Sequence, residues 1–126
     1  MKNVVYASFV CAFGLMLLLG QSEELLHWVA VHIQDFWAHY AIYSAFGIMI
    51  TAVFYLEDWW VWWAIPLGCF IATLEEARQI YLPHRSFEWS DMAANYWGIC
   101  TGFGLIYALV YLLSGRAPGI NDETLH

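Results

Sequence analysis

Long apolar runs with almost no charged side chains dominate this 126-residue sequence. A hydrocarbon core about 30 Å thick is crossed by roughly 20 apolar residues in an α-helix. Residues 36–56 and 92–114 reach that length, whereas residues 4–20 lie near its lower limit. Residues 59–74 reach it only by extending into the polar turn that follows. The pattern predicts an all-α integral membrane protein with four transmembrane helices and short connections.

The segment between the first two runs is more polar and has the pattern of a surface helix. From residue 21 to residue 36, Leu25, Val29, Ile33 and Phe36 recur at intervals of four, four and three, which places them on one helical face. A helix with one apolar face can lie in the plane of a membrane interface. We therefore expect an interfacial helix over residues 21–34.

The other connections are short. The stretch "YLEDWW" leaves room only for a tight hairpin between the second and third spans. Pro83 ends the third helix, because proline disfavours a helical conformation in the residue before it. Ser90 is a suitable N-cap for the fourth helix, and Asp91 in the first turn suits the helix dipole. A membrane domain is then expected over residues 1–114, followed by a polar tail over 115–126.

Composition agrees with a membrane protein. Hydrophobic residues make up 62% of the chain and charged residues 12%, which leaves too little polar surface for a soluble globule with four such runs. Four lysines and arginines stand against eleven acidic residues, so no basic face could follow the phosphates of a nucleic acid. The three cysteines lie in predicted spans without a spacing such as CxxC, so we predict no metal site and leave the redox compartment open.

The first run could be mistaken for a secretory signal. Leu18 stands where a cleavage site needs a small residue, so we interpret the run as the first span. Four spans put both termini on one side, with Lys2 and Arg116 there and Arg78 and Arg85 opposite. If the latter two belong to a site, the positive-inside rule places the termini in the cytoplasm. We expect a multi-pass cell-membrane protein in that orientation.

Unusual polar residues gather at the three helix ends that this topology brings to one membrane face. Within each end they are spaced three or four apart, so they share one side of their helix. They are Asp35, His39, Tyr43 and Gly47 in the second span, Glu76 and Gln79 in the third, and Asp91, Asn95, Gly98 and Gly102 in the fourth, with Arg85 in the loop between. Such polar groups are expensive in a bilayer unless they face protein or water and find partners. We predict a functional site here, with a structural polar clasp as the alternative, and close helix packing at the glycines of "GICTG".

Two segments, "DFWAHYAIYSAFG" and "LEEARQIYLPHRSFEWSDMAANYWGICTGFG", resemble the sequence blocks of the VanZ-like membrane proteins. In that family an Asp, a His and a Tyr open one helix, a Glu three before a Gln closes the next, and an Arg, an Asp, an Asn and two glycines follow. The matching positions are Asp35, His39, Tyr43, Glu76, Gln79, Arg85, Asp91, Asn95, Gly98 and Gly102. The resemblance covers residues 35–104 and departs at Phe36, where the family usually has a lysine, which puts in doubt any role that needs a cation there. It implies a cell-envelope role, since the name-giving member raises resistance to the glycopeptide antibiotic teicoplanin.

Three functions stay open at this point. In the first, the site binds an anionic or lipid-linked head group, so the partners are membrane lipids. Arg85, with Arg78 and His84 near it, would hold the anion through charge-assisted hydrogen bonds. The residues that orient the head group would be Asp35, His39, Asp91 and Asn95.

The second function is a lipid-modifying enzyme, in which His39 is the general base and Asp35 or Glu76 orients it. The third is a small accessory subunit of a larger membrane complex, whose partners are other membrane proteins. In that complex His39 would contact a pigment or haem. Apart from that contact, we predict no cofactor.

Overall fold

The structure is a computed structural model that describes residues 2–19, 21–32, 35–83 and 85–115. The described elements are all helical, which confirms the all-α prediction. They are α1 (Lys2–Leu19), α2 (Glu23–His32), α3 (Asp35–Leu56), the short 3-10 helix η1 (Val61–Trp63), α4 (Ala64–Gln79) and α5 (Trp89–Ser114). Ile33, His84, Arg116 and the rest of the predicted tail from residue 116 lie outside the described residues.

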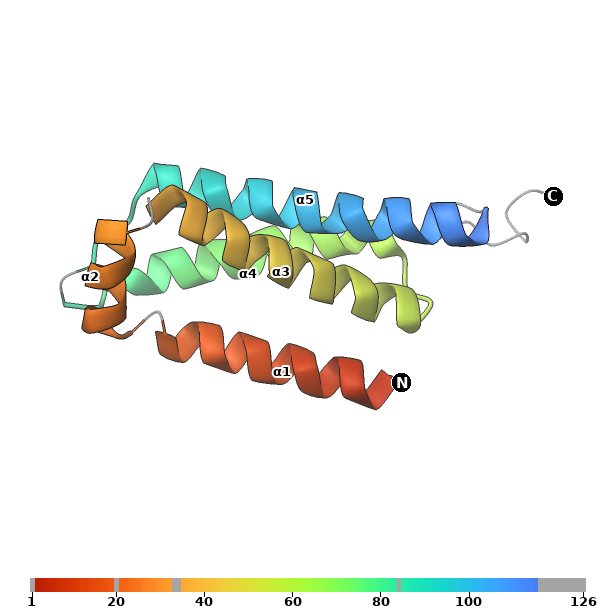
Figure 1. The fold of residues 1–126 in the computed structure, drawn as a ribbon, viewed down its shortest axis with the longest axis horizontal. Helices are drawn as coiled ribbons and strands as arrows, with labels where there is room; N and C mark the ends of the chain where they lie inside the picture. The colour runs from red at the N-terminus through yellow and green to blue at the C-terminus, as the bar shows by residue number, and fades with distance from the viewer. Residues whose placement is uncertain (1, 20, 33–34, 84, 116–126) are drawn as a thin grey trace.

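The helices form a small bundle. The α3 and α5 helices run side by side, α4 packs against both, and α1 packs along α3 (Figure 1). The short helix α2 crosses one end of the bundle, next to the start of α3. At the opposite end lie the start of α1 and the end of α5. The structure therefore has one end that carries α2 and the α4–α5 loop, and another that carries both outer helix termini.

The α4–α5 loop differs from the prediction at both of its ends. The α5 helix begins at Trp89 and its N-cap is Glu88, which has an extended backbone. Ser90 therefore lies in the first turn, and its predicted role as N-cap is wrong. The α4 helix ends at Gln79, before Pro83, because turn hydrogen bonds replace the helical ones after that residue.

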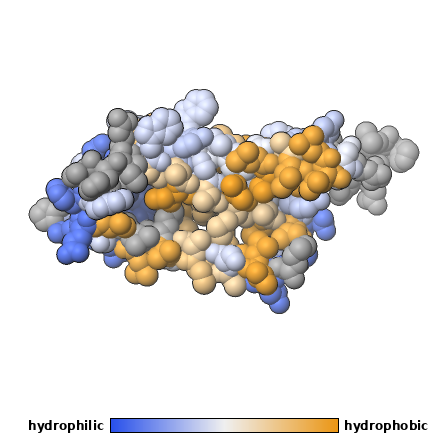
Figure 2. Space-filling view, in the orientation of Figure 1, coloured by the Kyte–Doolittle hydropathy of each residue, from blue (hydrophilic) through white to orange (hydrophobic). Residues whose placement is uncertain are grey.

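Two helices, α3 and α5, are long and apolar enough to cross a membrane. Only 33% of the apolar window of α3 and 22% of that of α5 are buried inside the structure, whereas the core helix of a soluble protein is mostly buried. Leu105, Leu109 and Leu112 of α5 are exposed. In Figure 2 hydrophobic residues cover much of the visible face away from the end that carries α2, where hydrophilic residues gather. This surface indicates membrane association.

Facing glycines let α3 and α5 approach closely. A Cβ atom on Gly98 would lie 2.6 Å from the carbonyl oxygen of Tyr40, and one on Gly47 would lie 2.6 Å from that of Ile99. Gly102 meets the backbone of α3 in the same way. These distances are too short for any larger residue, so the backbones themselves form the contact.

The α1 helix attaches to α3 through aromatic side chains. The rings of Phe9 and Phe13 lie 5.7 and 5.9 Å from the ring of Phe46, measured between centroids. Both distances are typical of favourable aromatic pairs. Phe46 itself belongs to the buried core cluster, so α1 extends that core on its outer side.

A second attachment lies at the N-terminal end of α1. Glu57, in the turn after α3, accepts a hydrogen bond from the hydroxyl of Tyr6 and lies 3.3 Å from the ammonium of Lys2. The Tyr6 hydrogen bond, with the help of Lys2, holds the pKa of the Glu57 carboxyl below its usual range. The ionised form of Glu57 therefore binds the start of α1.

We expect Gly98→Ala to lower the free energy of unfolding by about 1–3 kcal/mol, because the added methyl group would force α3 and α5 apart. Unfolding in detergent, followed by circular dichroism, measures the change. Gly104→Ala is the matched control, because nothing lies within 4 Å of a Cβ at that position. Equal stability of Gly98→Ala and the wild type would contradict the close packing.

The attachment at Glu57 should depend on pH. Because folding lowers the pKa of this carboxyl, its stabilising effect is complete above the usual carboxyl range and disappears as the pH falls through the lowered pKa. We expect hydrogen exchange of the first turns of α1 to accelerate on acidification. In Glu57→Gln, exchange there should be fast already at neutral pH and insensitive to pH once the intrinsic pH dependence is subtracted. The neighbouring change Asp58→Asn should leave the wild-type profile intact, and loss of the profile in that variant would contradict the assignment to Glu57.

Candidate functional site

His39 lies at the centre of the candidate site, in the second turn of α3 where the helix faces α5. Its Nδ1 atom is 2.9 Å from Oδ1 of Asn95, a residue of α5 that is fully buried. An amide oxygen only accepts hydrogen bonds, so Nδ1 carries the hydrogen of this contact. The neutral ring then has its lone pair at Nε2.

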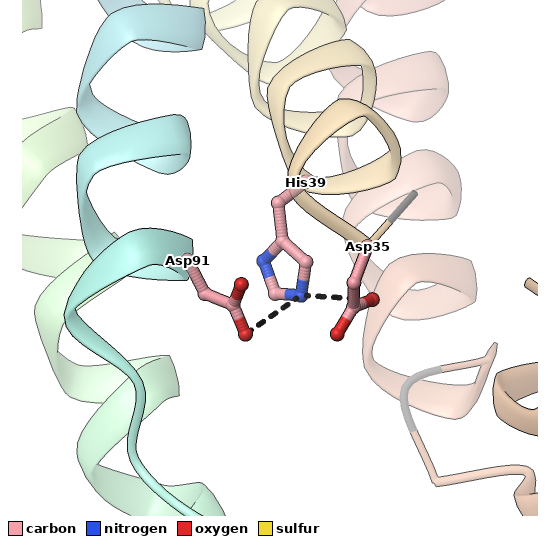
Figure 3. A group of neighbouring side chains, drawn as sticks. All are labelled: Asp35, His39 and Asp91. Atoms are coloured by element: carbon pink, nitrogen blue, oxygen red, sulfur yellow. Dashed lines mark ion pairs between the residues drawn. The ribbon is translucent and has the colours of Figure 1, made fainter. Parts of the chain in front are cut away.

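Two carboxylates face Nε2 of His39 (Figure 3). Asp35 Oδ1 lies 3.9 Å away and Asp91 Oδ2 lies 3.7 Å away. Asp35 precedes His39 by one helical turn on the same face of α3, and Asp91 lies in the first turn of α5. Both distances exceed that of a hydrogen bond. One ligand-type atom from each of the three residues lies within 4.8 Å of the others, so these residues could hold a metal ion.

The end of α4 contributes a second buried carboxylate group. Glu76 is fully buried, and its Oε1 accepts a hydrogen bond of 3.4 Å from the backbone N–H of Glu88. Its Oε2 accepts one of 3.4 Å from Nε2 of Gln79. Glu76 therefore ties the end of α4 to the residue that precedes α5. The Oε1 atom of Gln79 is buried and has no hydrogen-bond partner among the described residues.

A cavity of about 300 Å³ lies between α1 and α3 and reaches this end of the bundle. Its polar end is lined by Asp35, His39, Glu75, Gln79 and Arg85. The rest of its wall is mainly apolar and includes Phe9, Phe13, Ile42, Phe46 and Met49, with Tyr43 between the two parts. The cavity is therefore amphipathic along its length.

Negative charge exceeds positive charge at the polar end. Three carboxylates, those of Asp35, Glu76 and Asp91, surround His39. The guanidinium of Arg85 lies close enough to act on Glu76 and Asp91. The neighbouring cation, Arg78, is held by both oxygens of Glu75 and so does not compensate these groups. With a neutral imidazole and all three carboxylates ionised, the cluster carries two more negative than positive charges.

The structure brings together most of the residues that the sequence predicts for a site. Asp35, His39, Asp91 and Asn95 meet at one point between α3 and α5, with Glu76 and Gln79 beside them. Tyr43 and Arg85 line the cavity rather than this point, and Gly98 and Gly102 lie in the helix contact. His84 lies outside the described residues.

Sequence reasoning missed two parts of the site. Phe9 and Phe13 of α1 line the cavity, although the first helix carries no polar motif. Their spacing of four residues, which puts both rings on one face, is the signal that could have identified them. Glu75 was not assigned a role, and the structure pairs it with Arg78.

The Asn95 contact leads to a prediction about the imidazole. In nitrogen-15 NMR spectra recorded at a pH where the imidazole is neutral, wild-type His39 should be the Nδ1–H tautomer. Asn95→Ala should lose that preference and about 1–3 kcal/mol of stability, because the Nδ1–H is left without its acceptor. Thr101→Val is the control, since it removes the 2.9 Å Tyr40–Thr101 hydrogen bond between the same helices without touching His39. A wild-type ring protonated only at Nε2 would contradict the assignment.

Chemically, the site combines an oriented imidazole nitrogen, two carboxylates that face it and a guanidinium, all at one end of an apolar cavity. Such a set can bind a cation at the carboxylates or an anion at Arg85. The chain matches no protein-family model, no curated protein and no solved structure.

Proposed function

We propose that this chain is a four-span membrane protein of the VanZ-like type that binds an anionic, lipid-linked head group of the cell envelope. The observation that carries the proposal is the amphipathic cavity between α1 and α3. Its volume, about 300 Å³, lies at the lower end of the range of small-molecule sites. The head group binds at Arg85, and the hydrocarbon chain lies along the aromatic wall.

Helix lengths and the bundle arrangement support the proposed four spans. In addition to α3 and α5, the 18-residue α1 and the 16-residue α4 run along the bundle axis. At about 1.5 Å per residue they are about 27 and 24 Å long, close to the thickness of a hydrocarbon core. Exposed tryptophans at both ends, such as Trp60 and Trp89, suit the two interfaces.

The charges and the parity of the spans support the proposed orientation. Both outer termini lie at the end opposite the site, and Lys2 lies there. With these termini in the cytoplasm, the polar end of the cavity lies at the outer leaflet, and α2 lies in that interface.

The start of α2 is capped by a hydrogen bond of 3.3 Å that the backbone N–H of Leu25 donates to Oγ of Ser22.

Arg85 is the residue that selects an anion. It comes from the α4–α5 loop and lines the polar end of the cavity, where a phosphate of a lipid would lie. Charge-assisted hydrogen bonds to a phosphate contribute about 1.5–3 kcal/mol each. The ten residue positions that resemble the VanZ-like blocks include this arginine and the carboxylates and amides around it.

We expect Arg85→Gln to bind phosphatidylglycerol at least about tenfold more weakly than the wild type, because one charge-assisted hydrogen bond is lost. Native mass spectrometry of the protein released from membranes that contain phosphatidylglycerol and phosphatidylcholine measures the retained lipid. Arg78→Gln, which removes an equal charge from the same end, should retain the lipid because Glu75 already holds Arg78.

Met49→Trp tests the apolar part of the cavity separately. The larger side chain fills the wall where the hydrocarbon chain lies, so lipid retention should fall while Arg85 stays in place. Glycerol phosphate, which has no hydrocarbon chain, should not replace the lipid. Equal retention of both lipids in the wild type, or unchanged phosphatidylglycerol retention in Arg85→Gln, would contradict the proposal.

A further inference from the structure

We propose that Asp35, His39 and Asp91 bind a divalent transition-metal ion, Zn²⁺ or Mn²⁺, at the polar end of the cavity. The ligand atoms are Nε2 of His39 and one carboxylate oxygen from each aspartate. This inference does not depend on the lipid-binding proposal. It rests on the geometry of the three ligands, the hydrogen bond that orients the imidazole, the charge of the cluster and an unpartnered polar atom in the same cavity.

The spacing of the three ligand atoms fits a metal ion better than it fits direct hydrogen bonds. Nitrogen and oxygen ligands about 2.1 Å from a tetrahedral metal are separated by roughly 3.4 Å. The two observed separations from Nε2, 3.7 and 3.9 Å, exceed that value by a few tenths of an ångström. The two carboxylate oxygens lie within 4.8 Å of each other as well, so an ion between the three atoms would draw both carboxylates inward.

Asn95 prepares the imidazole for a metal. A metal-binding histidine typically donates its other ring N–H to an oxygen acceptor, which orients the ring and raises the basicity of the ligating nitrogen. Asn95 Oδ1 accepts from Nδ1 of His39 at 2.9 Å and so leaves the Nε2 lone pair facing Asp35 and Asp91. A lone pair that faces two carboxylates is repelled by both unless a positive charge lies between them.

The charges at this end favour a divalent ion over a protonated imidazole. When all three are ionised, Asp35, Glu76 and Asp91 carry three negative charges, of which the nearby guanidinium of Arg85 compensates one. Exposed Glu88 adds further negative potential next to Asp91. With these three groups ionised, an imidazolium would leave one negative charge of the partly buried cluster uncompensated, whereas a divalent ion compensates both remaining charges; uncompensated buried charge is strongly destabilising.

Gln79 supplies the independent sign of a ligand in this cavity. Its side chain is only 6% exposed, it lines the cavity together with Asp35 and His39, and its Oε1 has no hydrogen-bond partner among the described residues. Three protein ligands leave at least one coordination position open, as in metal sites that bind water or substrate. A metal-bound water in the cavity would donate a hydrogen bond to Gln79 Oε1.

One imidazole and two carboxylates favour transition metals over Mg²⁺ and Ca²⁺, which prefer oxygen ligands alone. The test uses Mn²⁺, because hard nitrogen and oxygen ligands bind it and thiols do not, so that the free cysteines Cys11, Cys69 and Cys100 do not interfere. The full chain in detergent, treated with a chelator and without added lipid, is titrated with Mn²⁺ and free ion is measured by electron paramagnetic resonance.

The wild type should bind one Mn²⁺ per chain. Asp35→Asn, His39→Ala and Asp91→Asn should each weaken binding at least about tenfold, and Asn95→Ala should weaken it about 10–100-fold through the orientation of the ring. Glu75→Gln is the matched control, because this carboxylate lines the same cavity but is held by Arg78, and its affinity should equal that of the wild type.

Asp35→Asn keeps the test decisive if the buried Asp91 variant does not fold, because the side chain of Asp35 is 45% exposed. Folding of each variant is checked by circular dichroism. Absence of saturable binding of both Mn²⁺ and Zn²⁺ to the wild type would overturn the proposal, as would equal Mn²⁺ affinity of folded Asp35→Asn and the wild type. A doubly protonated His39 in NMR spectra of the metal-free protein that persists in the presence of Mn²⁺ would also overturn it. The lipid is absent from this titration, so its outcome is independent of lipid binding.

Discussion

The close approach of α3 and α5 is the constraint on which the rest of the structure depends. Because Gly47, Gly98 and Gly102 have no Cβ, the two backbones touch, and the side chains one turn further along can reach across the interface. The 2.9 Å contact between His39 and Asn95 exists only at this separation. The glycines therefore act on the chemistry of the site without contacting it: they set the distance at which an amide on one helix orients an imidazole on the other.

The polar groups of the site lie apart from the apolar surface of the bundle. The surface of α3 and α5 away from the core is apolar. The carboxylates, the amides and the guanidinium gather at one end of the bundle, within two turns of a helix end or in the α4–α5 loop. The buried members hold one another, as Glu76 does with Gln79 and the backbone of Glu88. A polar cluster that stabilises the helix ends in this way is also preorganised to receive a charged ligand, because its members need little rearrangement.

Sequence reasoning predicted the helices well where an uninterrupted apolar run was the only signal needed. The charge-free runs 36–56 and 92–114 correspond to α3 and α5 within three residues, because nothing in them competes with a helix. The run 59–74 corresponds less well: its tryptophans look like the start of a span, but the chain first turns at Asp58, whose φ is +55°, and forms η1 before α4 begins at Ala64.

Helical spacing also identified the helix face that carries Asp35 and His39 and the one that carries Asp91 and Asn95. It could not show that Asp35 and Asp91 face the same ring nitrogen, because that depends on how α3 and α5 are rotated about their axes. It also missed the cavity, because Phe9 and Phe13 differ from other apolar residues only through what they pack against.

The way α1 is attached has a consequence for how a molecule reaches the cavity. This helix forms one wall, packs mainly against α3, and is held by an aromatic contact near its middle and by Lys2 and Tyr6 at the end away from the site. Its remaining side is turned outward, so in the proposed four-span arrangement the seam between α1 and its neighbours would face sideways into the hydrocarbon rather than upward into water. A long-chain amphiphile that follows this seam would then enter with its tail and its head together, without leaving the bilayer.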